Sequence, residues 1–236
     1  MSTHIGAEKG AIASTVWLPG DPRRAERIAE KFLTGIVRYN EVRNMSGYTG
    51  QTPMGQLVSV QGSGMGMPSL GIYVHELVHD FDVKRIIRLG STGALQKDMR
   101  PRDIVIAQCA SSNAGENYRR FRGMQFAASA DPMLFIDAVN AAKTLGIPAR
   151  IGGVVSTNIF YNDVDPDEWK LWASYGVLAI DMETSELYTL GAKMEKGFQA
   201  LSILTVSDVL PTGEELSALE RELAFDDMVR LAIHLT

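Results

Sequence analysis

Two stretches of sequence decide the fold: Ala179-Ile180-Asp181-Met182-Glu183-Thr184-Ser185 and Thr205-Val206-Ser207-Asp208. In each, a short apolar run stops abruptly on carboxylates and hydroxyls. Near-continuous apolar runs are typical of buried parallel strands, and open α/β sheets bind ligands beyond the carboxyl ends of their strands. We therefore expect Glu183 and Asp208 to face one crevice. A carboxylate that binds hydroxyls beside one that carries a proton suits a ligand with a sugar.

Outward from these stretches, predicted strands alternate with predicted helices. Strands are predicted at 15–18, 36–61 (as a meander), 84–89, 103–107 and up to 155, and helices at 22–32, 68–81, 132–145, 183–196 and 216–235. This alternation predicts a three-layer α/β/α protein whose central sheet is flanked by helices. The early meander predicts that the sheet is mixed and partly barrel-like. No linker or repeat divides the sequence, so we expect a single domain over residues 1–236.

Composition narrows the classes of function. The 236 residues carry a net charge of −5, which argues against a broad electrostatic grip on nucleic acid or an anionic membrane. A bound anion must therefore be held by locally placed arginines. The single cysteine, Cys109, cannot form an internal disulfide. No run reaches the roughly 18 apolar residues of a membrane span, and the N-terminus lacks a secretory signal, so we expect a cytoplasmic protein.

Two segments are candidate anion sites. Gly20-Asp21-Pro22-Arg23-Arg24 places backbone N–H groups and two guanidinium groups at a predicted helix start, which favours a negative ligand. Arg88-Leu89-Gly90-Ser91-Thr92-Gly93 delivers an arginine from a strand into a predicted Gly/Ser turn. The alternative for the first segment is a capped helix with solvated arginines. The alternative for the second is a plain tight turn. Arg43 is a third candidate that says little by itself.

A glycine-rich stretch and an acid complete the candidates from the residues alone. Gly62-Ser63-Gly64-Met65-Gly66 matches neither a dinucleotide fingerprint nor a P-loop, but its glycines would let the backbone approach a ligand closely. A plain turn explains it equally well. Asp208 is the candidate acid, and Arg221 in the last predicted helix is its candidate partner. The alternative for Arg221 is an exposed pair with a neighbouring acid on its own helix.

One motif points to a different chemistry. His75-Glu76-Leu77-Val78-His79 fits the H-E-x-x-H signature of zinc peptidases, with Glu76 as the general base. Residues four apart share one face of a helix. However, the other histidines, His4 and His234, lie at the chain ends, and nothing marks a third ligand. An ordinary amphipathic helix is the competing interpretation.

Taken in order along nearly the entire chain, the motifs resemble the nucleoside phosphorylase family, in particular the bacterial hexameric purine nucleoside phosphorylases. The stretches that carry the resemblance are His4-Ile5, Leu18-Pro19-Gly20-Asp21-Pro22, Val42-Arg43-Asn44-Met45, Gly64-Met65-Gly66-Met67-Pro68-Ser69, Ile87-Arg88-Leu89-Gly90-Ser91, Ile159-Phe160-Tyr161, Asp181-Met182-Glu183, Val206-Ser207-Asp208 and Glu220-Arg221.

The resemblance implies a phosphorylase/hydrolase-like fold and phosphorolysis of purine (2′-deoxy)ribonucleosides to the free base and pentose 1-phosphate. Inorganic phosphate is then a co-substrate, and no cofactor or metal is implied. The residue roles that it implies are phosphate binding by Gly20, Arg24, Arg88, Ser91 and a neighbour's Arg43; pentose binding by Met65, Met182, Glu183 and a neighbour's His4; base contacts by Phe160, Ile180 and Ser207; and proton donation to purine N7 by Asp208, helped by Arg221. We expect Arg221 to approach Asp208 as the proton leaves.

A site shared between subunits implies an oligomer, expected to be a homohexamer built as a trimer of dimers. The alternatives are a uridine phosphorylase, a phosphate-independent nucleosidase and a non-catalytic nucleoside-binding protein. Asn162-Asp163 after Tyr161 disfavours pyrimidines, and Arg24, Arg43 and Arg88 together disfavour a nucleosidase. Val209 after Asp208, where relatives commonly carry histidine, leaves the base preference open, as does Ser156-Thr157-Asn158.

Overall fold

The computed structural model describes residues 2–193 and 197–236. Its strands are β1 (Thr15–Leu18), β2 (Thr34–Asn40), β3 (Gly47–Gln51), β4 (Leu57–Gln61), β5 (Arg85–Ala94), β6 (Ile104–Ser112), β7 (Ala128–Ser129), β8 (Ala149–Ser156), β9 (Ala179–Asp181), β10 (Gln199–Val209) and β11 (Glu214–Glu215). Its helices are α1 (Pro22–Phe32), η1 (Val42–Asn44), α2 (Met67–His79), α3 (Gly115–Arg120), α4 (Pro132–Leu145), α5 (Glu168–Ser174), α6 (Thr184–Gly191), α7 (Ala218–Leu223) and α8 (Asp226–Ile233).

The central sheet is mixed and closes on itself. β5 pairs with β10, β10 with β6, β6 with β8, β8 with β9, and β9 again with β5, which completes a ring. From this ring the sheet continues through β1, β4, β3 and β2, where the predicted meander forms two antiparallel pairings. The predicted fold, an α/β protein with a mixed and partly barrel-like sheet, is confirmed.

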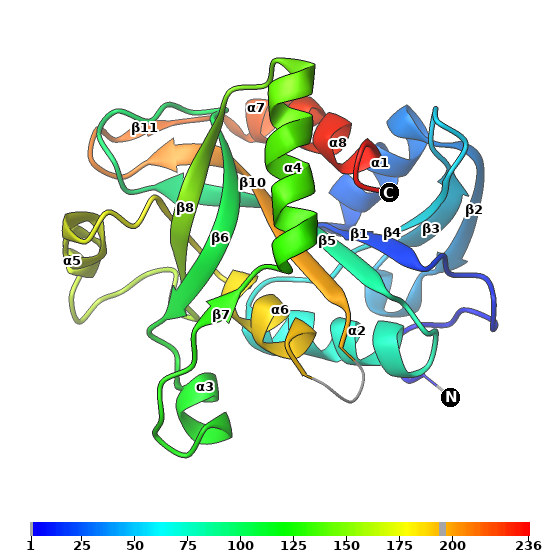
Figure 1. Cartoon of the computed structure of the whole chain (residues 1–236), viewed down its shortest axis with the longest axis horizontal. Helices are drawn as coiled ribbons and strands as arrows, with labels where there is room; N and C mark the ends of the chain where they lie inside the picture. Colours follow the sequence, from blue (N-terminus) through cyan, green and yellow to red (C-terminus); the bar gives the residue numbers. More distant parts are fainter. Residues whose placement is uncertain (1, 194–196) are drawn as a thin grey trace.

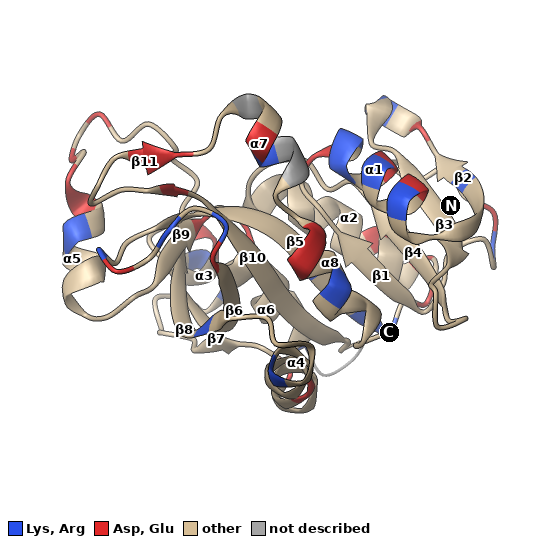
Figure 2. Cartoon of the chain, turned by 90° about the horizontal axis from the view of Figure 1, so that it is seen from above, with Lys and Arg blue, Asp and Glu red and all other residues tan. Residues whose placement is uncertain are grey.

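Helices flank this sheet on both sides. In Figure 1, α4 crosses in front of β10 and stands beside β6, while α2 and α6 lie together below the sheet. α4 contacts α8, and α6 contacts β6, β8 and β10. α1 packs on β3 and β4, and Figure 2 shows its Lys and Arg positions grouped beside α8. Among the described helices, none combines the length and apolar character needed to cross a membrane.

Local capping explains where two predicted helices begin. The Asp21 side chain accepts a hydrogen bond from the Arg23 N–H at 2.9 Å, and the Asp131 side chain accepts one from the Leu134 N–H at 2.9 Å. A proline follows each cap at the first helical position. Gly146 then ends α4 in the left-handed conformation, with φ of 64°. Both helices therefore match their predicted bounds.

Three details of the prediction were wrong or lie outside the structure. Residues 90–93 do not form a turn, because β5 continues to Ala94 while it pairs with β9 and β10. The predicted helix over 216–235 is broken into α7 and α8 at Phe225, which is buried and has non-helical backbone angles. The predicted helix over 183–196 ends as α6 at Gly191. The last part of that prediction, 194–196, falls outside the described residues.

Candidate active site

The candidate site is arranged along β5, whose neighbours approach it from opposite directions. β10 runs parallel to β5 and places Asp208 opposite Gly93. β9 runs antiparallel to β5 and places Ile180 opposite the same Gly93. The expectation that the strands carrying Glu183 and Asp208 run parallel was therefore wrong. The two carboxylates instead flank β5 at different points along its length.

A buried cation and two carboxylates define one end of this site. Arg88 Nη2 lies 2.5 Å from Glu183 Oε2, and Arg88 Nε donates to Asp181 Oδ2 at 3.2 Å. Asp181 also accepts from the Ser156 hydroxyl at 2.6 Å and the Thr184 hydroxyl at 2.6 Å. Because every one of these side chains is buried, their positions are fixed by their mutual hydrogen bonds.

The backbone of the glycine-rich stretch 62–66 also contributes to the Arg88 end of the site. The Gly66 N–H donates to Glu183 Oε1 at 2.6 Å. The loop after β1 is joined to the loop after β4, because the Gly64 N–H donates to the Gly20 carbonyl at 2.9 Å. A Cβ on Gly20 would meet the Gly64 carbonyl oxygen at 3.0 Å, so the glycine permits the approach. The glycine-rich stretch thus lies beside the Arg88–Glu183 pair.

Arg24 projects from the first turn of α1 and lies over the Phe225 ring, with its guanidinium carbon 3.7 Å from the ring centroid. Burial lowers the pKa of Arg24 to about 10; Asp21 raises it, and the neighbouring Arg88 lowers it further. Two partly desolvated cations that repel one another are stabilised by a bound anion. This geometry favours a small oxyanion between the two guanidiniums.

Arg88 and Glu183 each shift the pKa of the other. Burial raises the pKa of Glu183; Arg88 opposes that effect, and Asp181 adds to it. Burial alone would lower the pKa of Arg88, but Glu183 and Asp181 together raise it. The guanidinium therefore stays charged. Each Glu183 oxygen already has one partner, Gly66 N–H or Arg88, but its second lone pair can still accept a hydrogen bond from a ligand hydroxyl.

The other end of the site contains the predicted acid. Gly93 separates Ile180 from Asp208, and a Cβ added there would meet Asp208 Oδ2 at 2.8 Å and Leu210 Cδ1 at 2.7 Å. The Ser207 hydroxyl donates to Asp208 Oδ1 at 2.7 Å and lies 3.3 Å from the Thr92 carbonyl oxygen. Asp208 is thus held against β5, with its side chain 31% exposed.

Arg221 stands beside this acid without a hydrogen bond to it. Its Nη1 lies 3.8 Å from Asp208 Oδ1. Its Nε donates to the Leu216 carbonyl at 2.9 Å, and its Nη2 lies 3.2 Å from Glu215 Oε2. The approach of Arg221 during proton transfer remains a prediction that this geometry permits.

A cavity of about 370 Å³ opens next to Ile180 and Leu210. Glu168 braces its wall by accepting hydrogen bonds from the Asn113 amide at 2.8 Å and the Asn162 amide at 2.8 Å. The aromatic side chains on this cavity are Phe160, Tyr161, Trp169 and Trp172. Apolar and aromatic walls suit a flat heterocycle.

Several predicted ligand contacts are open to solvent in a single chain. Phe160 is 68% exposed and Met65 is 82% exposed, whereas Met182 and Ser91 are half-buried. Val209, the unusual residue after Asp208, is only 1% exposed and pairs with Ala94. It therefore belongs to the core rather than to the ligand wall.

His4 and Arg43 lie elsewhere. The His4 ring contacts the Tyr73 ring edge-on at 6.3 Å, and the charge of Arg43 acts on the same Tyr73. Gly66, which donates to Glu183, is the N-cap residue of α2. Tyr73 and Glu76 lie further along the same helix, and Glu76 is the residue that pairs with His4. Arg43 is exposed at a left-handed backbone position with φ of 56°. The structure does not bring these two residues to the Arg88 end of the same chain.

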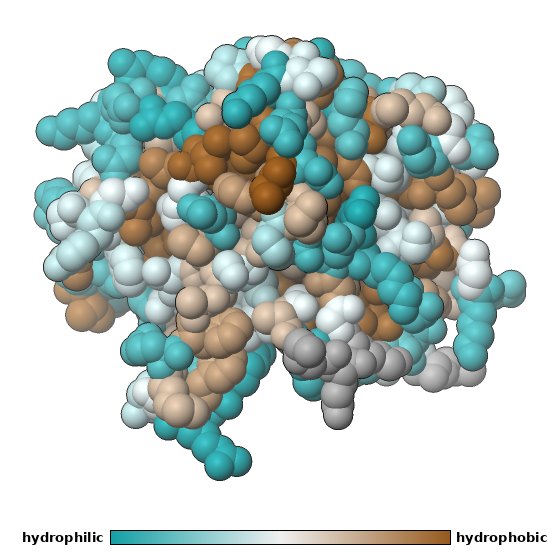
Figure 3. Space-filling view, viewed as in Figure 1, coloured by the Kyte–Doolittle hydropathy of each residue, from teal (hydrophilic) through white to brown (hydrophobic). Residues whose placement is uncertain are grey.

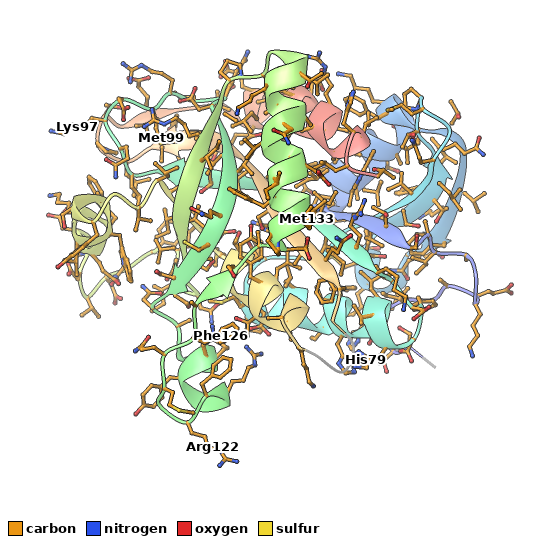
Figure 4. The ribbon with its side chains drawn as sticks, viewed as in Figure 1. His79, Lys97, Met99, Arg122, Phe126 and Met133 are labelled. Carbon is orange, nitrogen blue, oxygen red and sulfur yellow. The ribbon has the colours of Figure 1, made fainter. Side chains whose placement is uncertain are left out.

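The predicted zinc motif is arranged differently from a metal site. The rings of His75 and His79 stack on each other at 4.1 Å, and His79 Nδ1 lies 2.9 Å from the His75 carbonyl oxygen. Figure 4 shows His79 at the end of α2, at the lower edge of the molecule. Within residues 2–193 and 197–236, no group of three or more His, Cys, Asp or Glu side chains is arranged to hold a metal.

The sequence analysis missed three residues of this site. Asp181 fixes the position of Arg88 by accepting a hydrogen bond from its Nε. Gly90 leaves room for the Arg88 guanidinium, whose Cζ would lie 2.7 Å from a Cβ at position 90. Gly93 does the same for Asp208. The glycines were visible only as a turn signal, because the pairing of β5 with β9 and β10 is a tertiary property.

Fold and site together define an α/β protein in which a buried arginine, Arg88, lies beside Arg24 and pairs with two buried carboxylates. The profile described as the phosphorylase superfamily matches residues 15–235. Curated relatives named "Purine nucleoside phosphorylase DeoD-type" include that of Clostridium novyi (strain NT), 52% identical over 235 residues (100% of this chain and 99% of the relative), and that of Bacillus subtilis (strain 168), 52% identical over 234 residues (99% and 98%). A further relative of the same name, from Geobacillus kaustophilus (strain HTA426), is 50% identical over 233 residues (99% and 97%).

The chain therefore belongs to the phosphorylase superfamily and, within it, to the family of DeoD-type purine nucleoside phosphorylases.

Proposed function

We propose that this protein catalyses the reversible phosphorolysis of purine (2′-deoxy)ribonucleosides, giving the free purine base and (deoxy)ribose 1-phosphate. The glycosidic C1′–N9 bond breaks and a C1′–O bond to phosphate forms, so the reaction is a pentosyl transfer. One observation carries the proposal: Arg88 lies 2.5 Å from Glu183 and within electrostatic reach of Arg24. An anion and a sugar hydroxyl would thus be bound side by side.

In this proposal, phosphate occupies the space beside Arg24 and Arg88. Backbone groups near Gly20 and the side chain of Ser91 add contacts, and Arg43 of a neighbouring subunit closes the site. Arginine suits this role because its planar fork contacts two oxygens at once. The bound anion lies under C1′, where positive charge develops as the glycosidic bond breaks, and it stabilises that charge.

The nucleoside then lies along β5 from Arg88 toward Gly93. Glu183 binds pentose hydroxyls, with Met65 and Met182 against the sugar and His4 supplied by the neighbour. Ile180 and Phe160 contact the base, and Ser207 faces its edge beside Asp208. Ile180 and Asp208 both pair opposite Gly93, five residues beyond Arg88 on β5, so the base end and the phosphate end of this arrangement are separated along the strand.

Asp208 is proposed as the general acid that protonates N7 of the leaving purine. Such help is commonly worth about 10²–10⁴ in rate. Ser207 already donates to one carboxylate oxygen of Asp208 at 2.7 Å, which leaves the other oxygen for the base. Arg221, 3.8 Å away, would stabilise the carboxylate once the proton has left.

We further propose a homohexamer, built as a trimer of dimers, in the cytoplasm. This rests on the contacts of His4 and Arg43, which the structure places beside Tyr73 of α2 rather than with the Arg88–Glu183 pair. Figure 3 also shows hydrophobic side chains gathered on one face around β8 and α4, where Met133, Ile136 and Ile151 are exposed. The chain is proposed to be one phosphorylase domain over residues 1–236, with phosphate as co-substrate and no cofactor.

The test is incubation of the purified protein with inosine, adenosine and uridine, with and without phosphate. Phosphate-dependent release of hypoxanthine or adenine together with pentose 1-phosphate is expected. Release of base without phosphate would instead identify a nucleosidase, and preferred cleavage of uridine would identify a pyrimidine enzyme. Binding of nucleosides without turnover would contradict the catalytic proposal.

A further inference from the structure

Glu215 is a carboxylate on β11 to which the proposed reaction gives no role. β11 pairs antiparallel with β10, and Glu215 stands directly opposite Asp208. Side chains opposite one another in an antiparallel pair lie on the same face, with Cβ atoms roughly 5 Å apart. In Figure 2, the acidic strand β11 leads through a short connection into α7, the helix that carries Arg221. A second carboxylate is therefore placed beside the proposed acid, within reach of the same arginine.

Arg221 lies between these two carboxylates and is hydrogen-bonded to Glu215. Its Nη2 donates to Glu215 Oε2 at 3.2 Å, whereas its Nη1 lies 3.8 Å from Asp208 Oδ1, beyond hydrogen-bond distance. Its Nε donates to the Leu216 carbonyl at 2.9 Å, which fixes the near edge of the guanidinium. The guanidinium thus rests on Glu215 while it faces Asp208.

The exposure of the two carboxylates decides which is the better partner for Arg221. The Glu215 side chain is 71% exposed, and that of Asp208 is 31% exposed. Water and salt screen the attraction of an exposed charge more than that of a partly buried one. A protonated Asp208 has no charge to compete with Glu215. An ionised Asp208, being less screened, would compete with Glu215 for the arginine.

This arrangement suits an acid that changes its charge during the reaction. In the proposed step, the proton moves from Asp208 to N7 of the purine, and the electron pair of the C1′–N9 bond passes to the base. The base leaves neutral, and the negative charge stays on Asp208. A guanidinium hydrogen-bonded to a carboxyl group favours its ionised form. An arginine bound to Asp208 too early would therefore oppose the protonated state that the reaction needs.

We propose that Glu215 is a positioning residue for Arg221: it binds the guanidinium away from Asp208 while the acid is protonated, and releases it once proton transfer leaves Asp208 charged. This inference rests on the proposed function. It gives a defined role to a carboxylate outside the ligand cavity, because Glu215 acts on the acid through Arg221 and touches no substrate.

The first test compares two substrates that differ in their need for a proton. Glu215→Gln keeps the size of the side chain but removes the charge that binds Arg221. We expect kcat for inosine to fall about 3- to 20-fold at unchanged KM, a part of the roughly 10²–10⁴ that general acid help contributes. For 7-methylguanosine, kcat should change less than about two-fold, because its N7 already carries a methyl group and a positive charge and takes up no proton.

A neighbouring residue provides the matched control. Glu214 is exposed on the same two-residue strand but stands opposite Val209 instead of Asp208. Glu214→Gln removes the same charge from β11 and should leave the rates on both substrates as in wild type. A loss in this variant equal to that in Glu215→Gln would overturn the inference, because the effect would then follow the charge of β11 and not the contact with Arg221.

A double-mutant cycle tests whether Glu215 acts through Arg221. On inosine, Glu215→Gln combined with Arg221→Ala should be no slower than Arg221→Ala alone. A further loss in the Arg221→Ala background, wild-type rates for Glu215→Gln, or equal losses on inosine and 7-methylguanosine would each overturn the inference. If wild type does not accept 7-methylguanosine, the cycle on inosine decides alone. A wild-type protein that does not cleave inosine, adenosine or 7-methylguanosine would overturn the proposed function instead, and this inference with it.

Discussion

Arg88 and Glu183 form one buried ion pair, with Nη2 and Oε2 2.5 Å apart, although Arg88 lies on β5 and Glu183 is the N-cap residue of α6. In the proposed reaction, the first binds phosphate and the second binds the pentose. The side chain that binds phosphate is therefore held in place by the side chain that binds the pentose, and the reverse also holds. We expect the affinities for phosphate and nucleoside to depend on one another for this reason.

Glu183→Gln tests that dependence. The variant loses a charged acceptor, and hydrogen bonds to charged groups are worth about 1.5–3 kcal/mol. We expect kcat/KM for inosine to fall at least ten-fold and KM for phosphate to change as well. The matched control is Glu186→Gln, which weakens the ion pair between the buried Glu186 carboxylate and the partly exposed Arg120 outside the site. Initial rates at varied phosphate and inosine give both constants, and an unchanged phosphate KM would contradict the coupling.

Asp208→Asn should nearly abolish adenosine cleavage, because asparagine cannot supply a proton to N7. A loss of about 10²–10⁴ in kcat is expected from removing general acid catalysis. Asp227→Asn, on the surface of α8 and paired with Arg230, is the control. Near-normal turnover of adenosine by the Asp208 variant would refute the acid role.

Gly93→Ala tests whether β5 sets the position of the acid. The added methyl would lie 2.8 Å from Asp208 Oδ2 and 2.7 Å from Leu210 Cδ1, so the carboxylate must move. We expect kcat to fall at least ten-fold with phosphate KM unchanged, because the Arg88 end is untouched. Gly115→Ala has open space around its Cβ and should behave as wild type. Equal activity of the two variants would show that Asp208 does not depend on Gly93.

Arg24→Ala should raise KM for phosphate at least ten-fold. The guanidinium is partly desolvated beside Arg88, and its removal takes away half of the charge that this chain offers to the anion. The adjacent Arg23→Ala is the control, since that side chain is exposed beyond the cap of α1. A phosphate KM that responds to Arg23 rather than Arg24 would place the anion elsewhere.

Acid should weaken the attachment of the N-terminus. The pKa of Glu76 is about 2 in the folded chain, below its ordinary value of 4.5, so the ionised form stabilises the folded state. That contribution is complete above about pH 4.5 and is lost as the pH falls toward 2. Thermal unfolding between pH 6 and 2.5 should show a steeper loss of Tm for wild type than for Glu76→Gln. Parallel curves would mean that the carboxylate contributes no pH-dependent stability.

Much of the fold was readable from local signals. Asp21 and Asp131, each followed by proline, fixed the starts of two helices, because caps act through their own backbone neighbours. Phe225 was misread as part of one long helix, because its burial under Arg24 depends on α1, far away in the sequence. The same distinction holds for residues 90–93, whose glycines fit a turn until β9 and β10 pair with them.

The sequence by itself determined which chemical groups are present and in what order: the arginines, Glu183 and Asp208 at the ends of apolar runs, within a whole-chain pattern typical of one enzyme family. Only the tertiary structure decided how they meet. It closed the sheet so that β9 and β10 run along β5 in opposite directions, paired Asp181 with Arg88, and paired His4 with Glu76. The physical reason is that helix caps and apolar runs are short-range properties, whereas buried ion pairs and ring closure join residues that are distant in the chain.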